Sequence, residues 1–184
     1  DVFYQGGVEG YFQGKSDIEI YYKIFEQKNA EKAIVISSGR TEAVIKYKEL
    51  IYDLFMNGYS VYIHDHRGQG FSGRMTQNPQ MGYIDSFQFY IDDLKFFYDN
   101  FVSKRPYEKT YLLAHSMGGA IGMTYLQQHP NDFSAASFSS PMLGFKPGIC
   151  KLSSLLDNEQ PKFAIGQTEY NDKKNNFEDN ALTG

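Results

Sequence analysis

The stretch LLAHSMGGAIG, residues 112–122, decides the fold. It closes an apolar run that begins at residue 110 and is typical of a buried strand, and it opens a segment with helical spacing. Ser116 stands at the junction, with the small residues Ala114 and Gly118 two positions to either side. A tight turn from strand to helix needs such small neighbours, and it exposes a serine hydroxyl at the end of a sheet.

Ser116 has two interpretations. As a nucleophile it would attack a carbonyl carbon, and the N–H of Met117 in the first helical turn would stabilise the oxyanion of the tetrahedral intermediate. As a structural residue it would only cap the helix that follows. The strand, the tight turn and the helix occur together, and this combination favours the nucleophile.

Strands and helices are expected to alternate around this turn. We predict strands at 18–25, 32–38, 59–65, 110–115 and 133–140, and helices at 42–57, 86–102 and 117–129. This order indicates an α/β fold with a mostly parallel sheet and helices on both faces. From Pro141 onward the sequence is polar, Asn-rich and irregular, so we divide the chain into a core, residues 1–140, and the start of a cap or lid, residues 141–184.

A second oxyanion donor is expected from the loop after an earlier strand. The stretch ISSGRTE, residues 36–42, is the candidate, because its strand ends at Ser38–Gly39 and the N–H of Arg40 would then face Ser116. The alternative is that Gly39 and Arg40 form an ordinary turn between a strand and a helix.

Composition excludes several classes of function. The net charge is −4 and no basic stripe occurs, so a nucleic-acid partner is not expected. Cys150 is the single cysteine, which rules out an internal disulfide. No apolar run reaches the roughly 18 residues that a membrane span needs, and no signal peptide is visible. The aromatic content of 16% favours a large core and an apolar ligand surface.

Two patterns suggest cofactors, and neither is complete. Gly68, Gly70 and Gly73 match the glycine pattern of dinucleotide-binding loops, but no helix is expected to begin at the last glycine. His64 and His66 would point to one side of a strand, with no neighbouring residues to complete a metal site, so we expect structural roles for them. We therefore predict no cofactor and no metal.

Several stretches resemble the α/β-hydrolase superfamily, and within it the monoacylglycerol-lipase-like serine hydrolases. HDHRGQGFSGR (64–74) resembles the Asp-x-Arg-Gly-x-Gly-x-Ser loop of that family, and AHSMGG (114–119) resembles its serine turn. Residues 39–70 and 81–94 resemble the bacterial lysophospholipase branch, including Gly39-Arg40 where other branches have His-Gly. The loop pattern falls on Asp65, Arg67, Gly68, Gly70 and Ser72.

The resemblance implies an esterase that needs no cofactor and cleaves lipid esters, either lysophospholipids or monoacylglycerols, through an acyl-enzyme on Ser116. It also implies a cytoplasmic location, or a peripheral one at the inner membrane. A short-chain esterase or a peptidase on the same fold stays open, as does a non-catalytic pseudo-hydrolase. The oligomeric state is open too.

The general base of such an enzyme is not found in these residues. The family order is Ser, then Asp or Glu, then His, and the single histidine after Ser116 is His129. At 1.5 Å per helical residue, His129 would lie roughly 15–20 Å from Ser116, beyond hydrogen-bond reach. His115 should point away from Ser116. We expect that the triad acid and histidine lie outside these 184 residues, that the chain is the N-terminal half of a longer protein, and that it is inactive alone.

Overall fold

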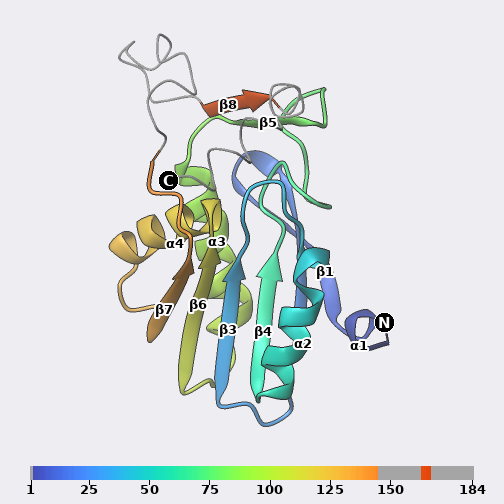
Figure 1. Cartoon of the computed structure of the whole chain (residues 1–184), viewed down its shortest axis with the longest axis vertical. Coiled ribbons are helices and arrows are strands. Elements are labelled where there is room, and N and C mark those ends of the chain that lie inside the picture. The colour runs from blue at the N-terminus through green and yellow to red at the C-terminus, as the bar shows by residue number, and fades with distance from the viewer. Residues whose placement is uncertain (1, 145–162, 167–184) are drawn as a thin grey trace.

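The structure is a computed structural model that describes residues 2–144 and 163–166. Its centre is a sheet of six strands in the order β1-β2-β4-β3-β6-β7 (Figure 1). The strands are β1 (Val8–Gln13), β2 (Glu19–Phe25), β3 (Lys32–Ser37), β4 (Tyr59–His64), β6 (Lys109–His115) and β7 (Ala135–Ser139). Strands β4, β3, β6 and β7 are parallel, while β1 and β2 are antiparallel to their neighbours.

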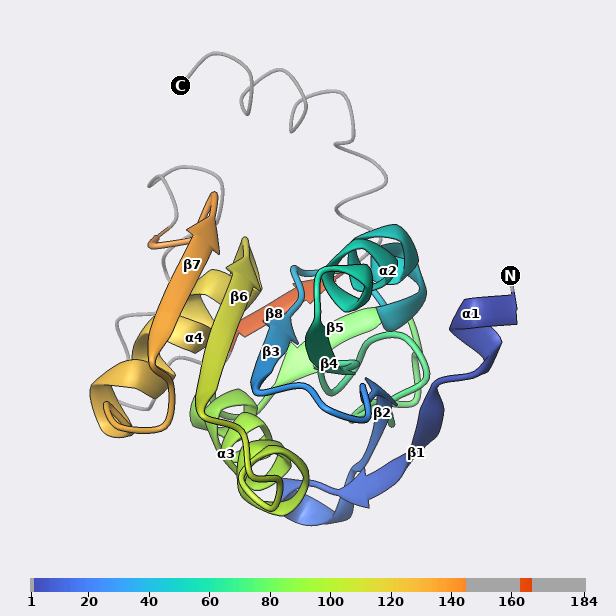
Figure 2. The ribbon, with the colours of Figure 1, turned by 90° about the horizontal axis from the view of Figure 1, so that it is seen from below.

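Helices cover both faces of this sheet, which confirms the predicted α/β architecture (Figure 2). One face carries α1 (Val2–Gln5) and α2 (Lys48–Met56), and the other carries α3 (Gln88–Phe97) and α4 (Met117–Gln128). The short helical segments are η1 (Lys15–Asp17), η2 (Val44–Tyr47) and η3 (Tyr98–Val102). None of the helices in the described part of the chain is long and apolar enough to cross a membrane.

Strand β3 shows how the sheet divides the core into two layers. Ala33 and Val35 pack toward α3 and α4, while Ile34 and Ile36 pack toward Ile51 of α2. Successive side chains of a strand point to opposite faces, so a strand buried on both sides must be apolar throughout. This requirement explains the continuous apolar run that predicted β3.

Three of the described strands lie where no strand was predicted. The first, β1, includes Phe12, which stacks on Phe96 and Phe97. The other two, β5 (Met81–Ile84) and β8 (Phe163–Gly166), pair antiparallel with each other.

The helix predicted for 42–57 is divided into η2 and α2, and Gly58, with φ of 89°, lies just beyond the end of α2. Most of the predicted cap, residues 145–162 and 167–184, lies outside the described residues, and so does Cys150.

Candidate active site

The ends of four parallel strands form one edge of the sheet. Strands β3 and β6 are in register with Ser37 opposite Ala114, and β6 and β7 with His115 opposite Ser139. The loop after β3, the loop after β4 and the turn at Ser116 therefore leave the sheet side by side, beneath β5 and β8 (Figure 1). In open α/β sheets, ligands bind at this carboxyl edge.

The turn at Ser116 is strained. Ser116 has φ of 50° and ψ of −118°, and its side chain makes no capping hydrogen bond to α4. Its N–H donates to the Ser139 carbonyl at 3.0 Å, and its own carbonyl accepts from the N–H groups of Gly119 and Met142, both at 2.9 Å. Ser116 thus occupies the N-cap position of α4 without the extended backbone angles and the side-chain bond that an ordinary cap residue has.

The small residues around Ser116 are explained by close backbone contacts. A Cβ at Gly118 would lie 2.2 Å from the Ser37 carbonyl oxygen and 2.4 Å from that of Ser38. A Cβ at Gly119 would lie 2.7 Å from Cβ of Pro141, just after β7. The first turn of α4 thus fits between the chain segments that follow β3 and β7.

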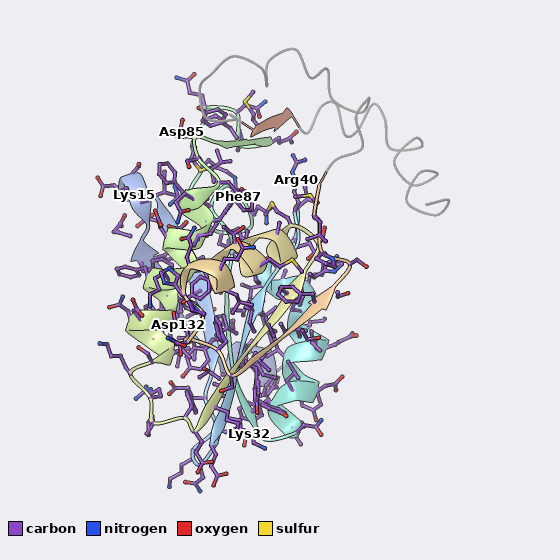
Figure 3. All side chains as sticks on the ribbon, turned by 90° about the vertical axis from the view of Figure 1, so that its left-hand side faces the viewer. Lys15, Lys32, Arg40, Asp85, Phe87 and Asp132 are labelled. Atoms are coloured by element: carbon purple, nitrogen blue, oxygen red, sulfur yellow. The ribbon has the colours of Figure 1, made fainter. Side chains whose placement is uncertain are left out.

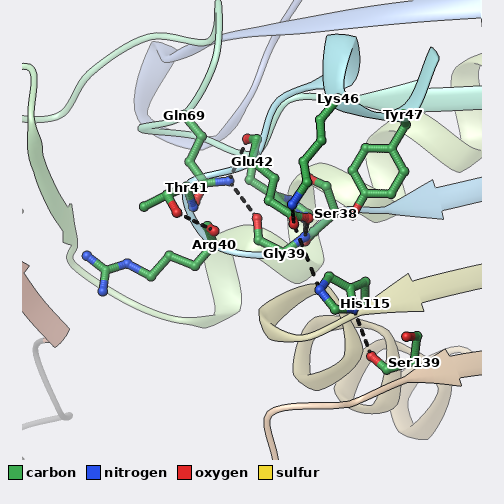
Figure 4. A network of polar contacts seen from close by, with 11 residues as sticks. Ser38, Gly39, Arg40, Thr41, Glu42, Lys46, Tyr47, Gln69, His115 and Ser139 are labelled. Carbon is green, nitrogen blue, oxygen red and sulfur yellow. Dashed lines mark hydrogen bonds and ion pairs between the residues drawn. The ribbon is translucent and has the colours of Figure 1, made fainter. Parts of the chain in front are cut away.

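Two backbone N–H groups were predicted as oxyanion donors. Met117 is the first residue of α4, so its N–H has no acceptor within the helix and lies at the positive end of the helix dipole. Arg40 lies in the loop after β3, and its side chain extends away from Glu42 and His115 (Figure 4). Figure 3 places Arg40 on the side of the molecule that carries β5 and β8. Their roles as donors stay predictions.

Glu42 organises the loop after β3, although the sequence did not single it out (Figure 4). Its buried carboxylate accepts the Gly39 N–H at 2.7 Å and hydrogen bonds from Lys46 and Tyr47. Burial acts to raise the pKa of Glu42, but the hydrogen bonds from Lys46, Tyr47 and Gly39 outweigh it and hold this pKa below its ordinary value. The signal in the sequence was an acidic and a basic residue four apart beside an apolar helix.

His115 and Gln69 tie neighbouring segments to this loop. Nδ1 of His115 lies 3.1 Å from the Ser139 carbonyl oxygen, and Nε2 lies 3.8 Å from Glu42 Oε1. The amide nitrogen of Gln69 donates to the Gly39 carbonyl at 3.0 Å, and its oxygen accepts the Thr41 N–H at 2.8 Å. Both ring nitrogens of His115 therefore face residues other than Ser116.

The loop after β4 is wrapped around the buried carboxylate of Asp65. Its oxygens accept the N–H groups of Val44 at 2.7 Å and Phe71 at 2.8 Å, and Ser72 Oγ donates to its carbonyl at 2.6 Å. Burial raises the pKa of Asp65, and these backbone N–H groups oppose the rise. Gly70 has φ of 49°, and a Cβ there would lie 2.0 Å from Asp65 Oδ2, so only glycine fits.

Arg67 anchors the same loop to α3. Its Nε and Nη2 each donate to Asp93 at 2.7 Å, and Nη2 also donates to the Lys15 carbonyl at 3.1 Å. No helix begins at Gly73, since β5 intervenes before α3. The glycine pattern therefore serves a wrapped loop, and a dinucleotide-binding helix is absent at this point of the described chain.

The remaining histidines occupy structural positions. Burial holds the pKa of His64 well below its ordinary value and lowers that of His66 to about 4. His64 packs against Phe97, and His129 follows α4 with its ring against Tyr125. Across residues 2–144, no three His, Cys, Asp or Glu side chains gather in a way that could hold a metal ion.

Comparison with known protein families decides the classification. The family model described as serine aminopeptidase, S33, matches residues 28–176. The chain belongs to this α/β-hydrolase family. Membership establishes the fold and not the activity, because one fold can carry many different activities.

Named relatives of this S33 chain act on lipids. Lysophospholipase L2 of Escherichia coli (strain K12) is 38% identical over 170 residues, which are 92% of this chain and 49% of that protein. Phospholipase YtpA of Bacillus subtilis is 35% identical over 66% of this chain and 45% of that protein, and the monoglyceride lipase of Rattus norvegicus is 29% identical over 82% and 50%. The chain spans about half the length of these curated relatives.

Solved structures show the same fold. A soluble variant of monoglyceride lipase from Saccharomyces cerevisiae matches 75% of this chain and 46% of its own, with a TM-score of 0.64 at 21% identity. A carboxyl esterase from Bacillus coagulans matches 83% and 49%, with a TM-score of 0.67 at 19% identity. The α/β-hydrolase fold predicted from the sequence is confirmed.

Proposed function

We propose that the complete gene product is a serine hydrolase that cleaves carboxylic esters of lipids, either lysophospholipids or monoacylglycerols. Ser116 Oγ attacks the ester carbonyl, the alcohol leaves with a proton, and water then releases the fatty acid from the acyl-enzyme. The N–H groups of Met117 and Arg40 stabilise the oxyanion. The strained backbone of Ser116 carries this proposal, because it presents a hydroxyl that makes no capping bond.

The triad acid and base are proposed to come from outside these 184 residues. All four histidines lie in the described residues, and each is accounted for elsewhere. His115 contacts Ser139, His129 follows the far end of α4, and both His64 and His66 are buried. The core is proposed to end near residue 140, with the cap beginning at 141. On this view the 184-residue chain alone would not turn over substrate.

The proposed substrate class is supported by the relatives rather than by the site geometry. The proteins named as lysophospholipase, phospholipase and monoglyceride lipase match 92%, 66% and 82% of this chain. We propose a lipid ester as the partner molecule, met in the cytoplasm or at the inner membrane surface. A peptidase is the second candidate, because the matching family model carries the description serine aminopeptidase.

A fluorophosphonate probe tests the nucleophile. It should label the wild-type complete protein and fail to label Ser116→Ala. Ser140→Ala is a matched control, because Ser140 also follows a parallel strand with a positive φ, here 45°, and its loss should leave labelling unchanged. Labelling of Ser116→Ala at the wild-type level would overturn the assignment.

Turnover assays test the substrate. Fatty acid release from lysophosphatidylcholine and from monoacylglycerol should exceed release of p-nitroaniline from aminoacyl p-nitroanilides, and long-acyl p-nitrophenyl esters should be preferred over short-acyl ones. Preference for the anilides would favour the peptidase, and preference for short acyl groups would favour a general esterase.

A further inference from the structure

His66 lies against the end of β3, next to the loop that carries Arg40. It is not a member of the loop pattern formed by Asp65, Arg67 and Ser72. It is buried, with 1% of its surface exposed. Its Nε2 lies 3.1 Å from the Ser38 carbonyl oxygen and 3.3 Å from Ser37 Oγ. One ring nitrogen thus contacts two consecutive residues at the end of β3.

The hydrogen-bond pattern defines the tautomer of this ring. Ser37 Oγ donates to the Gly118 carbonyl at 3.2 Å, so toward His66 it offers a lone pair. The Ser38 carbonyl also accepts. Both neighbours of Nε2 are therefore acceptors, and Nε2 must carry the proton. Nδ1 has no hydrogen-bond partner within residues 2–144, which fits a ring held from one side only.

This single N–H is linked to both halves of the site, directly to the end of β3 and through Ser37 to α4. Ser38 lies two residues before Arg40, and Gly118 directly follows Met117. The end of β3 and the first turn of α4 are in backbone contact, because a Cβ at Gly118 would lie 2.2 Å from the Ser37 carbonyl oxygen. The chain of hydrogen bonds runs from His66 to Ser38 on one side, and through Ser37 to the first turn of α4 on the other.

We propose that His66, acting through Ser37 and Ser38, is a positioning residue that sets the spacing between the N–H groups of Arg40 and Met117. This inference rests on the proposed function, in which those two N–H groups bind the oxyanion. Donors aimed at charge that develops in the transition state affect kcat more than substrate binding, so His66 should do the same.

The test compares variants of the complete protein on one lipid ester. His66→Leu should lower kcat about 10-fold while KM stays within about 2-fold, less than the roughly 100-fold or more lost with a whole oxyanion donor. His66→Gln should recover most of the loss, because its amide can donate from the position of Nε2. Ser37→Ala removes the link from His66 to Gly118 and leaves the hydrogen bond from His66 to Ser38, so it should lower kcat by a smaller factor with KM unchanged.

His64→Leu is the matched control. His64 is as deeply buried as His66, its ring centroid lies 5.0 Å from that of His66, and neither of its nitrogens has a hydrogen-bond partner in the described residues. It should leave kcat and KM unchanged. Affinity for a trifluoromethyl ketone, which forms a tetrahedral adduct, should weaken in His66→Leu in proportion to kcat.

The inference is overturned if His66→Leu retains the wild-type kcat, if His64→Leu loses as much, or if His66→Gln gives no recovery. Should His66→Leu fail to fold, as judged by circular dichroism, Ser37→Ala and His66→Gln decide alone, and an unchanged kcat in Ser37→Ala overturns it. Failure of the proposed function looks different: wild type would then hydrolyse no ester, or Ser116→Ala would be as active as wild type.

Discussion

Replacing Arg67 with methionine should lower the free energy of unfolding by about 3–5 kcal/mol, because it leaves a buried carboxylate unpaired. Arg67 donates twice to Asp93, at 2.7 Å each, and the two side chains are 1% and 2% exposed. The Lys15 carbonyl loses its donor from Nη2 as well. The cost comes mainly from the desolvated charge on Asp93, whose side chain is 2% exposed.

The chain offers a matched control on its surface. Arg105 also donates twice to one carboxylate, that of Glu26, at 2.8 and 2.9 Å, but these side chains are 54% and 35% exposed. Arg105→Met should therefore cost less than about 1 kcal/mol. The two pairs share geometry and differ in burial, so the difference between the variants measures the effect of burial.

Urea unfolding followed by circular dichroism provides the assay, with a third variant to separate charge from packing. Arg67→Met combined with Asp93→Leu should be more stable than Arg67→Met alone, because it removes the unpaired charge. The reasoning is refuted if Arg67→Met and Arg105→Met lose equal stability, or if the double variant is less stable than Arg67→Met. A confirmed result would show that this pair holds the loop after β4 on α3.

Two further predictions concern acid stability and the serine turn. Burial holds the pKa of His64 well below 6.5, so the unfolded chain alone takes up this proton as the pH falls through about 6.5, and stability is lost in that direction. His64→Leu should therefore lose about 2 kcal/mol less unfolding free energy than wild type between pH 7 and pH 5, and equal losses would contradict this. Gly118→Ala should abolish fluorophosphonate labelling and lower Tm, because its Cβ would lie 2.2 Å from the Ser37 carbonyl oxygen. Gly122→Ala should keep labelling, since its Cβ meets the end of the Leu112 side chain at 2.9 Å rather than backbone atoms. Labelling retained in Gly118→Ala would refute the steric account.

The strands that the sequence predicts well are those whose burial is complete. Strand β3 is buried from Ala33 to Ser37, and its apolar run shows this directly. Strand β1 has one buried residue, Phe12, between exposed or half-buried neighbours, so no alternation marks it. Strand β5 pairs with β8, some 80 residues away along the chain, and no local pattern could indicate that partner.

The residues of the candidate site likewise fall into those that the local sequence predicts and those that it does not. Ser116, Ala114 and Gly118 were predicted because the turn imposes a local spacing of small residues. Glu42 and His66 were not assigned to the site, since their contacts depend on how separate loops meet. His66 lies 28 residues from Ser38 in sequence, and its hydrogen bond follows from the order of β4 and β3 in the sheet.

The strained backbone of Ser116 favours a reactive role over a structural one. A φ of 50° with ψ of −118° lies outside the regions that L-residues adopt freely, and such strain costs about 1–3 kcal/mol. Glycine would adopt these angles at little cost, and a residue that only capped α4 would be extended. The chain instead keeps a side chain here, half-exposed at the start of a helix, and surrounds it with glycines that permit the turn. A hydroxyl held in this way at the expense of stability supports the proposal that Ser116 is the nucleophile.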